Sequence, residues 1–225
     1  EGDAMGSMCA RSGAAAARPA RRAGRDGDSS VNPSCSSLLA PPFLALLTHE
    51  AIQKVLIVGC GGGFDFVHSM MLYPEFRRLG KKVVIVSNSF GNVKDFKAEP
   101  VLAELNASPS LDVRRVTAKT PHRSPSNYAP ELHVLSFLDA SFPGDAPHAM
   151  YACNARDMVV PAFSRFLEGF GADALVTVDG GSDSLMVGDE QGLGDPIEDA
   201  VTIGSVHACS APVKLLLTVG LGCDR

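Results

Sequence analysis

The 225-residue sequence contains no tryptophan, and aromatic residues make up only 6% of the chain. Surfaces that bind single-stranded nucleic acids stack bases on aromatic side chains, so stacking on nucleobases is not expected. The body of the chain also lacks a sustained basic stripe, and the formal net charge is −5 at pH 7. We therefore expect no nucleic-acid partner.

Long apolar runs and paired cysteines are absent as well. The apolar run at 38–47 contains Pro41 and Pro42 and is far shorter than the ~20 residues that a membrane span needs. The six cysteines form no C-x-x-C pair, and their spacing matches neither a zinc site nor a compact disulfide framework. A reducing compartment is the simpler interpretation, so we expect a cytoplasmic protein without a membrane partner.

Residues 1–50 differ in composition from the rest of the chain. They are rich in Arg, Ala, Ser and Pro and show neither helical nor strand periodicity. We expect them to form a tail without packed core contacts, followed by one α/β domain over residues 51–225. Their composition also partly fits a transit peptide, so organelle targeting is an alternative to a disordered tail or to sequence translated upstream of the true start.

Short β-branched runs alternate with helical patterns along the body. Residues 54–58 and 81–86 are typical of strands buried on both faces, and residues 65–79 between them are helical, which predicts a parallel β-α-β unit. Further strands are expected at 111–116, 132–138, 174–178 and 214–219, and helices at 101–106, 151–170 and 196–208. The predicted fold class is α/β, a Rossmann-like three-layer fold with a mainly parallel sheet.

Three of the predicted strands end in loops rich in glycine and aspartate. These loops read GCGGGFD at 59–65, DGGSD at 179–183 and GLGCD at 220–224. Because parallel strands end at one edge of a sheet, where ligands bind in open α/β folds, the loops are expected to converge into a binding site. The alternative for each single loop is a tight turn in which Asp65 or Asp183 caps the next helix.

The first loop does not match the common nucleotide-binding motifs. A G-x-G-x-x-G fingerprint starting at Gly59 would place its third glycine at Phe64, and the second strand ends without the acid that binds a ribose. The glycine motif of S-adenosylmethionine methyltransferases fits partly, with Ile57 in place of its Asp. NAD is therefore disfavoured, and a methyltransferase-like nucleoside or S-adenosylmethionine binder stays as an alternative. Cys60 is interpreted as a space-filling residue of the turn, and His68 as a packed or solvated residue rather than a catalytic one.

Carboxylates are concentrated towards the end of the chain. Between Gly171 and Arg225, nine acidic residues stand against two basic ones, a balance that suits cations. Glycine loops suit phosphate, which carboxylates repel, and a bridging Mg²⁺ or Mn²⁺ would remove this conflict. We therefore expect the protein to bind a small phosphorylated or nucleotide-like molecule with a divalent metal, as an enzyme or as a non-catalytic ligand-sensing or assembly subunit.

The loop at 179–190 is the predicted functional centre. Asp179 and Asp183 are the predicted catalytic groups, and together with Glu190 they are the predicted metal ligands. The predicted ligand-binding residues come from all three loops: Gly59, Gly61, Gly62, Gly63, Asp65, Gly180, Gly181, Gly220, Gly222 and Asp224. The expected partner is a small molecule, and assembly into a homo-oligomer stays open.

Three stretches carry a resemblance to a known family. They read VLIVGCGGGFDFVHSMML at 55–72, VTVDGGSDSLMVGDEQGLGDPIEDAVTI at 176–203 and LLLTVGLGCD at 215–224. In this order they resemble the domain of unknown function 1152 family, with its motifs V-x-G-x-G-G-G-D, D-x-G-G-D-x-L-x-G-x-E with S-P-x-x-D-A, and G-x-G-x-D. The resemblance implies an α/β fold and no particular activity.

The sequence departs from these family motifs in three places. Ser182 is inserted or shifted within the second motif, Asp195 stands where a serine is usual before the proline, and Phe64 separates the glycines from the aspartate of the first motif. Family members generally continue beyond the last motif, which implies a C-terminally truncated domain.

Overall fold

The computed structural model describes residues 47–101, 105, 110–123, 128–144, 146–187, 189 and 196–220, with only the backbone described at Arg156. All described residues belong to one compact unit, which lies within residues 40–225. No helix within the described ranges is both long and apolar enough to cross a membrane.

Strands and helices alternate along this unit. The strands are β1 (Lys54–Gly59), β2 (Lys82–Ser89), β3 (Val113–Thr117), β4 (Ala149–Asn154), β5 (Ala174–Asp179) and β6 (Val213–Thr218). The α-helices are α2 (Tyr73–Arg78), α3 (Pro130–Ser141), α4 (Val160–Glu168) and α5 (Pro196–Ala208). Short 3₁₀ segments are η1 (Asp65–Met71), η2 (Val93–Asp95), η3 (Ala155–Asp157) and η4 (Asp183–Leu185).

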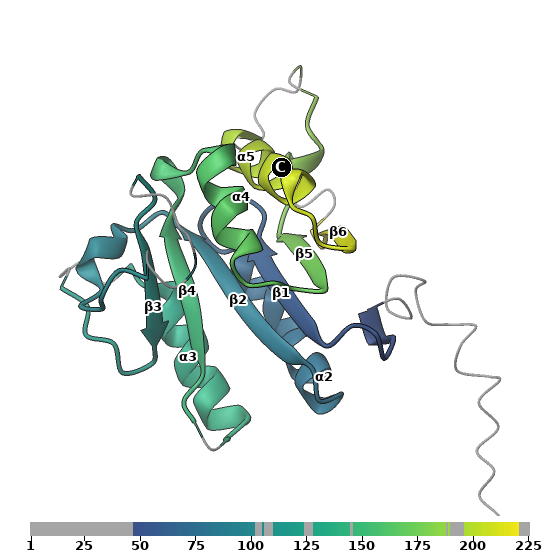
Figure 1. The fold of residues 1–225 in the computed structure, drawn as a ribbon. Helices are drawn as coiled ribbons and strands as arrows, with labels where there is room; N and C mark the ends of the chain where they lie inside the picture. The colour runs from purple at the N-terminus through teal and green to yellow at the C-terminus, as the bar shows by residue number, and fades with distance from the viewer. Residues whose placement is uncertain are drawn as a thin grey trace, which may run out of the picture. The chain divides into compact units, whose positions relative to one another are not determined.

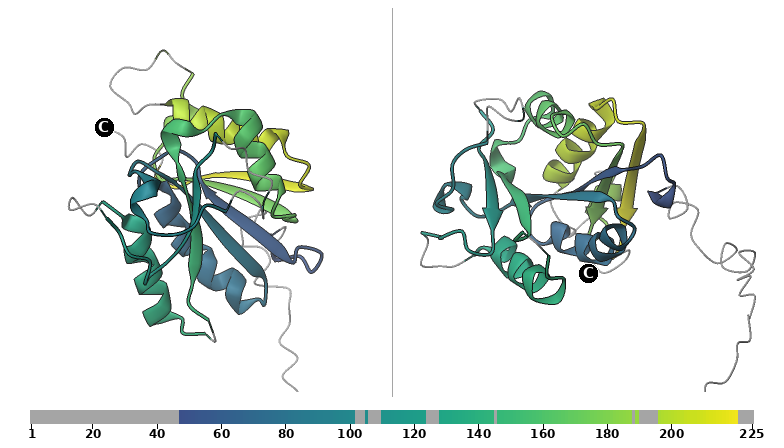
Figure 2. Two further views of the ribbon diagram at one scale, coloured as in Figure 1. Left: turned by 60° about the vertical axis from the view of Figure 1, so that its left-hand side comes forward. Right: turned by 60° about the horizontal axis from the view of Figure 1, so that its bottom comes forward.

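The strands form one sheet in the order β3-β4-β2-β1-β5-β6. Every pairing is parallel except that of β3 with β4. Helices α4 and α5 cover one face of the sheet, and α2 and α3 lie on the other (Figures 1 and 2). This arrangement confirms a three-layer α/β fold with a mainly parallel sheet, and it is compatible with the Rossmann-like topology that the sequence predicts.

The central strand β1 shows why its sequence is a continuous apolar run. Leu56 and Val58 pack into the core cluster shared with α4 and α5, whereas Val55 and Ile57 pack into a cluster on the opposite face. All four side chains are fully buried. A strand covered by helices on both faces has no solvent side, so the alternation of polar and apolar residues disappears.

Two of the predicted elements are wrong. The strand expected at 132–138 lies inside α3, and the helix expected at 151–170 is divided into β4, η3 and α4. A short apolar run fits a strand and a buried helix equally well, which explains the first error. In the second, Pro161 lies in the first turn of α4, where proline is favoured, and it therefore marks the start of a helix rather than an interruption within one.

Other elements agree with the sequence to different degrees. Helix α5 matches the predicted helix at 196–208, and the predicted strand at 111–116 corresponds to β3, which is antiparallel to its neighbour. The helical stretch at 65–79 is divided into η1 and α2, close to the interruption expected at Pro74. Most of the helix predicted at 101–106 lies outside the described residues.

The packed core begins earlier than the sequence predicts. Leu47 is fully buried and belongs to the core cluster that contains Val55 and Phe76. The expectation that residues 1–50 make no core contact is therefore wrong at Leu47. Residues 1–46 lie outside the described part.

Candidate functional site

The loops that follow β1, β5 and β6 meet at one edge of the sheet. The backbone N–H of Cys60 donates to the carbonyl of Val178 at 2.8 Å, and that of Val219 donates to the carbonyl of Asp179 at 2.9 Å. Gly220 packs so closely on Gly180 that a Cβ atom would lie 2.2 Å from the Gly180 carbonyl oxygen. The predicted convergence is confirmed for these loops, whereas Gly222 and Asp224 lie outside the described residues.

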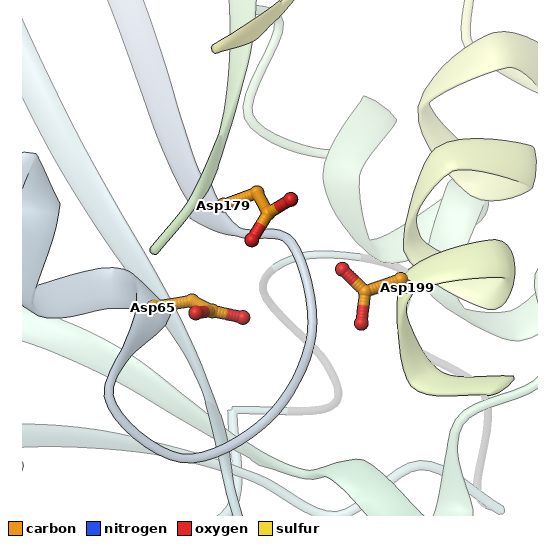
Figure 3. A group of neighbouring side chains, drawn as sticks. All are labelled: Asp65, Asp179 and Asp199. Carbon is orange, nitrogen blue, oxygen red and sulfur yellow. The ribbon is translucent and has the colours of Figure 1, made fainter. Parts of the chain in front are cut away.

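Three aspartates point into a common space at this edge (Figure 3). Asp65 begins η1, Asp179 ends β5 and Asp199 lies in the first turn of α5. One carboxylate oxygen from each residue lies within 4.8 Å of the corresponding oxygens of the other two. Asp179 and Asp199 are 0% and 2% exposed, and Asp65 is half-buried, so three acidic groups meet where little water can screen them.

Asp65 connects two of the loops. Its Oδ2 accepts a hydrogen bond from the Gly61 N–H at 2.8 Å, and its Oδ1 accepts one from the Gly180 N–H at 3.0 Å. Burial raises the pKa of this carboxyl, although the two N–H donors act in the opposite direction. These bonds reach backward and across the site, so Asp65 joins the glycine loops rather than capping the helical segment that it begins.

Asp179 closes the turn that follows β5. Its Oδ1 accepts from the Gly181 N–H at 2.7 Å, and its Oδ2 accepts from the Ser184 hydroxyl. Asp183 begins η4 and is half-buried, and it does not belong to the group of three close carboxylates. Glu190 lies outside the described residues. Of the two predicted metal ligands within the described residues, Asp179 belongs to the close cluster and Asp183 does not.

Asp199 is the acid that the sequence prediction missed. Its Oδ1 is buried and has no hydrogen-bond partner within the described residues, and its carboxyl accepts a hydrogen bond from the Cys60 thiol. Burial, together with the charge of Asp183 and the two clustered aspartates, raises the pKa of Asp199 to about 7. Asp199 is the aspartate of the P-x-x-D-A motif, which was the available sequence signal for this residue. The signal was ambiguous, because acidic residues are common in the first turn of any helix.

Asp65 and Asp199 of this cluster line a pocket of about 480 Å³. Its lining residues are Gly62, Phe64, Asp65, His68, Phe90, Gly180, Gly181, Asp183, Glu198 and Asp199. Four of them are acidic and none is Lys or Arg, so the field inside the pocket is negative.

The family model described as "Protein of unknown function (DUF1152)" matches residues 56–225. The chain belongs to this family. No curated protein matches the chain. The matched region contains all three clustered aspartates, and the resemblance carried by the glycine- and aspartate-rich motifs is confirmed. Because the family is defined without a function, the chemistry of the DUF1152 site follows from its geometry.

At two positions of the DUF1152 site, neighbouring side chains lie so close to the backbone that only glycine fits. A Cβ atom at Gly61 would lie 2.4 Å from Asp199 Oδ2 and 2.9 Å from Asp65 Oδ2, because the first loop passes between the two carboxylates. At Gly180 a Cβ atom would lie 2.4 Å from the His68 ring. Any larger residue would push the acids or the histidine out of the pocket.

His68 lies in the pocket of this DUF1152 protein rather than in its packed core. It follows Asp65 by one turn of η1, and its ring contacts the backbone at Gly180. Its Nδ1 is buried without a hydrogen-bond partner among the described residues. The sequence predicts a packed or solvated rather than a catalytic His68, and the structure places its half-buried ring in the pocket wall beside the carboxylates.

The end of β2 gives no support to a ribose-binding role. Asn88 is 1% exposed, and its Nδ2 donates to the Gly59 carbonyl at 2.8 Å and to the Thr202 hydroxyl at 3.0 Å. Its own carbonyl accepts from the Gly63 N–H at 3.2 Å. The residue that would meet a ribose in a dinucleotide-binding fold here connects the first glycine loop to α5.

A larger cavity of about 710 Å³ lies on the opposite side of the DUF1152 domain, at the amino ends of β2 and β4. Arg77 and Arg115 line it, together with His148, whose ring bonds to Asp139 at 2.9 Å. The clustered aspartates are not part of this cavity. The carboxyl edge of the sheet is therefore the better candidate for function.

Proposed function

We propose that this protein binds a divalent cation, Mg²⁺ or Mn²⁺, with Asp65, Asp179 and Asp199, and that the cation holds a small phosphorylated molecule in the adjoining pocket. The observation that carries the proposal is the Oδ1 of Asp199. It is buried without a partner in the described part of the chain, and it belongs to a side chain that faces two further carboxylates.

Electrostatic repulsion supports a cation in this position. At a separation of 4.8 Å, two unit charges repel by about 3 kcal/mol at an effective dielectric constant of about 20. A proton on Asp199 relieves part of this repulsion, in agreement with its pKa of about 7. A divalent cation relieves it for all three groups and displaces the weakly held proton of Asp199.

The donor atoms favour magnesium or manganese over zinc. All three candidate ligands are carboxylates, and the nearby Cys60 thiol is buried with a raised pKa, so it stays protonated as a donor to Asp199. An octahedral Mg²⁺ with oxygens at about 2.1 Å separates its ligand atoms by about 3–4 Å, so only a small inward movement of the aspartates is required.

Phosphate is the ligand that such a cation would bring into the pocket. The lining residues include no Lys or Arg, so a direct anion site is disfavoured, whereas a cation held by two or three carboxylates keeps positions open for phosphate oxygens and water. If the bound molecule reacts, Asp179 would hold the cation and Asp183, which lines the same pocket, would accept a proton from an attacking water. The sequence predicts both residues as catalytic groups and both as metal ligands, and the proposal divides these roles between them.

Binding of Mn²⁺ to the full chain tests the proposal. We expect titration calorimetry, or the loss of the free Mn²⁺ electron paramagnetic resonance signal, to show one site per chain, with Mg²⁺ competing. Asp199→Asn should weaken Mn²⁺ binding at least tenfold.

Glu198→Gln is the matched control, since it removes a neighbouring acid of the same pocket that lies outside the close cluster. It should change Mn²⁺ affinity by less than threefold. Absence of Mn²⁺ binding by the parent, or an equal loss in both variants, would contradict the proposal.

A further inference from the structure

Two phenylalanine side chains are exposed at the rim of the acidic pocket. Phe64, at the end of the first glycine loop, is 59% exposed, and Phe90, directly after β2, is 51% exposed. Both line the pocket beside Asp65 and Asp199. Exposed rings cost free energy in water, and when they lie in a pocket they are common contacts of a ligand.

Each of these rings contacts a neighbouring residue of the site. The Phe90 ring lies directly over the first loop, where a Cβ atom at Gly62 would be 1.9 Å from its Cε1 atom. Phe64 contacts Tyr128 edge to face, with ring centroids 5.9 Å apart at an angle of 79°. The glycine therefore leaves room for one ring, and the tyrosine supports the other. We call Phe64 and Phe90 together the aromatic wall.

The pocket thus has two chemically different parts within one volume of about 480 Å³. The aspartates suit a metal-bound charged group, and the aromatic wall suits a flat apolar group next to it. A ligand that satisfied only the aspartates would leave both rings in water. Flat heteroaromatic rings stack on aromatic side chains with little dependence on their hydrogen-bonding pattern.

We propose that the ligand is a nucleoside phosphate, whose base lies against the aromatic wall while its phosphates reach the cation. This inference rests on the proposed function and adds the class of molecule. The low aromatic content of the chain gave the opposite expectation for base stacking, because composition does not report that two of the eleven phenylalanines lie beside the acids.

A flat organic amine is the main rival, since a cation would be attracted by both rings and carboxylates. It would need no metal. The close approach of three buried carboxylate oxygens, with the unpartnered Oδ1 among them, favours a small multivalent ion over a bulky ammonium group. The test therefore includes an amine arm.

Calorimetry on the full chain with saturating Mn²⁺ would compare ADP, GDP, CDP and UDP with inorganic pyrophosphate, which has similar charge and no ring. We expect at least one of the nucleotides to bind tenfold or more tightly than pyrophosphate. Phe90→Leu should abolish this difference and leave the affinities for pyrophosphate and for Mn²⁺ within twofold of the parent. Phe137→Leu, which changes a phenylalanine of α3 that is 54% exposed and does not line the pocket, is the control and should behave as the parent.

The remaining outcomes contradict either the nucleotide inference or the proposed cation site. If the parent binds Mn²⁺ but no nucleotide more tightly than pyrophosphate, or if Phe90→Leu keeps the difference, the nucleotide inference is wrong and the cation site stands. If benzylamine binds in EDTA and Phe90→Leu abolishes that binding, the rival amine is the ligand. If the parent binds no Mn²⁺, the proposed function fails. In that case, nucleotide binding in EDTA is compared between the parent and Phe90→Leu, and a loss in the variant shows that the base contacts the aromatic wall without a cation.

Discussion

Replacing Asp199 with asparagine is expected to stabilise the metal-free protein at neutral and alkaline pH, although the same change weakens cation binding. Burial and the charges of neighbouring acids raise the pKa of Asp199 from 3.8 to about 7. The folded protein therefore retains this proton over a pH range in which the unfolded chain has lost it. The asparagine amide is neutral at every pH, so the variant avoids the cost of the charge.

The sign and size of the effect follow from this shift. A group with a raised folded-state pKa contributes its full stability below the unfolded value of 3.8, and this contribution is lost as the pH rises towards about 7. The shift of about three pH units corresponds to at most about 4 kcal/mol. Relaxation of the site around the charged carboxylate lowers this cost, so we expect a gain of about 2 kcal/mol at pH 8. This corresponds to an increase in Tm of about 4–8 °C.

Thermal melts in EDTA at pH 4 and pH 8 measure this difference. The Tm of the variant should lie above that of the parent at pH 8, and the two should nearly coincide at pH 4. Adding Mn²⁺ should raise the Tm of the parent far more than that of the variant. If Asp199→Asn destabilises the protein equally at both pH values, then a packing contact rather than a strained charge dominates at this position, and the reasoning fails.

Two further substitutions separate the roles of the other site residues. Asp65→Asn should lower the free energy of unfolding in urea denaturation by about 1–3 kcal/mol at pH 4, because its amide nitrogen cannot accept the N–H of Gly61 or of Gly180. The loss should be smaller at pH 8, where removal of a buried charge with a raised pKa offsets part of it; unchanged stability at pH 4 would contradict this. Gly61→Ala should abolish Mn²⁺ binding, since its methyl group would occupy the space next to the Asp199 carboxylate. Gly144→Ala is its control, with no neighbouring atom closer than 3.9 Å to the added carbon, and normal Mn²⁺ binding by Gly61→Ala would refute this reading of the loop.

The sequence predicted the centre of the fold better than its edges. Strands β1 and β5 are buried on both faces, so their β-branched runs have one plausible interpretation. Residues 132–138 allow two interpretations, because the short apolar run that lies inside α3 is equally compatible with a strand. The antiparallel direction of β3 depends on pairing across the sheet, which the local pattern does not contain.

The site was predictable where its residues follow a strand. Asp65 and Asp179 stand next to glycines at strand ends, so topology alone brings them together. Asp199 comes from a helix twenty residues after Asp179, and its approach to the other acids depends on how α5 packs. Phe90 had no signal either, because its contact with Gly62 exists only in three dimensions.

If the three aspartates hold a cation as proposed, the hydrogen bonds of Asn88 have a consequence for ion selectivity. This one buried side chain joins the Gly59 carbonyl to Thr202 of α5, and its backbone carbonyl accepts from Gly63. The loop that passes between Asp65 and Asp199 is thus fixed at both ends to β2, and the helix that carries Asp199 is held by the same residue. A carboxylate cluster that cannot widen freely discriminates between ions by their radius. Ca²⁺ is larger than Mg²⁺ and needs six to eight oxygens at about 2.3–2.6 Å. The cluster should therefore bind Ca²⁺ more weakly than Mg²⁺.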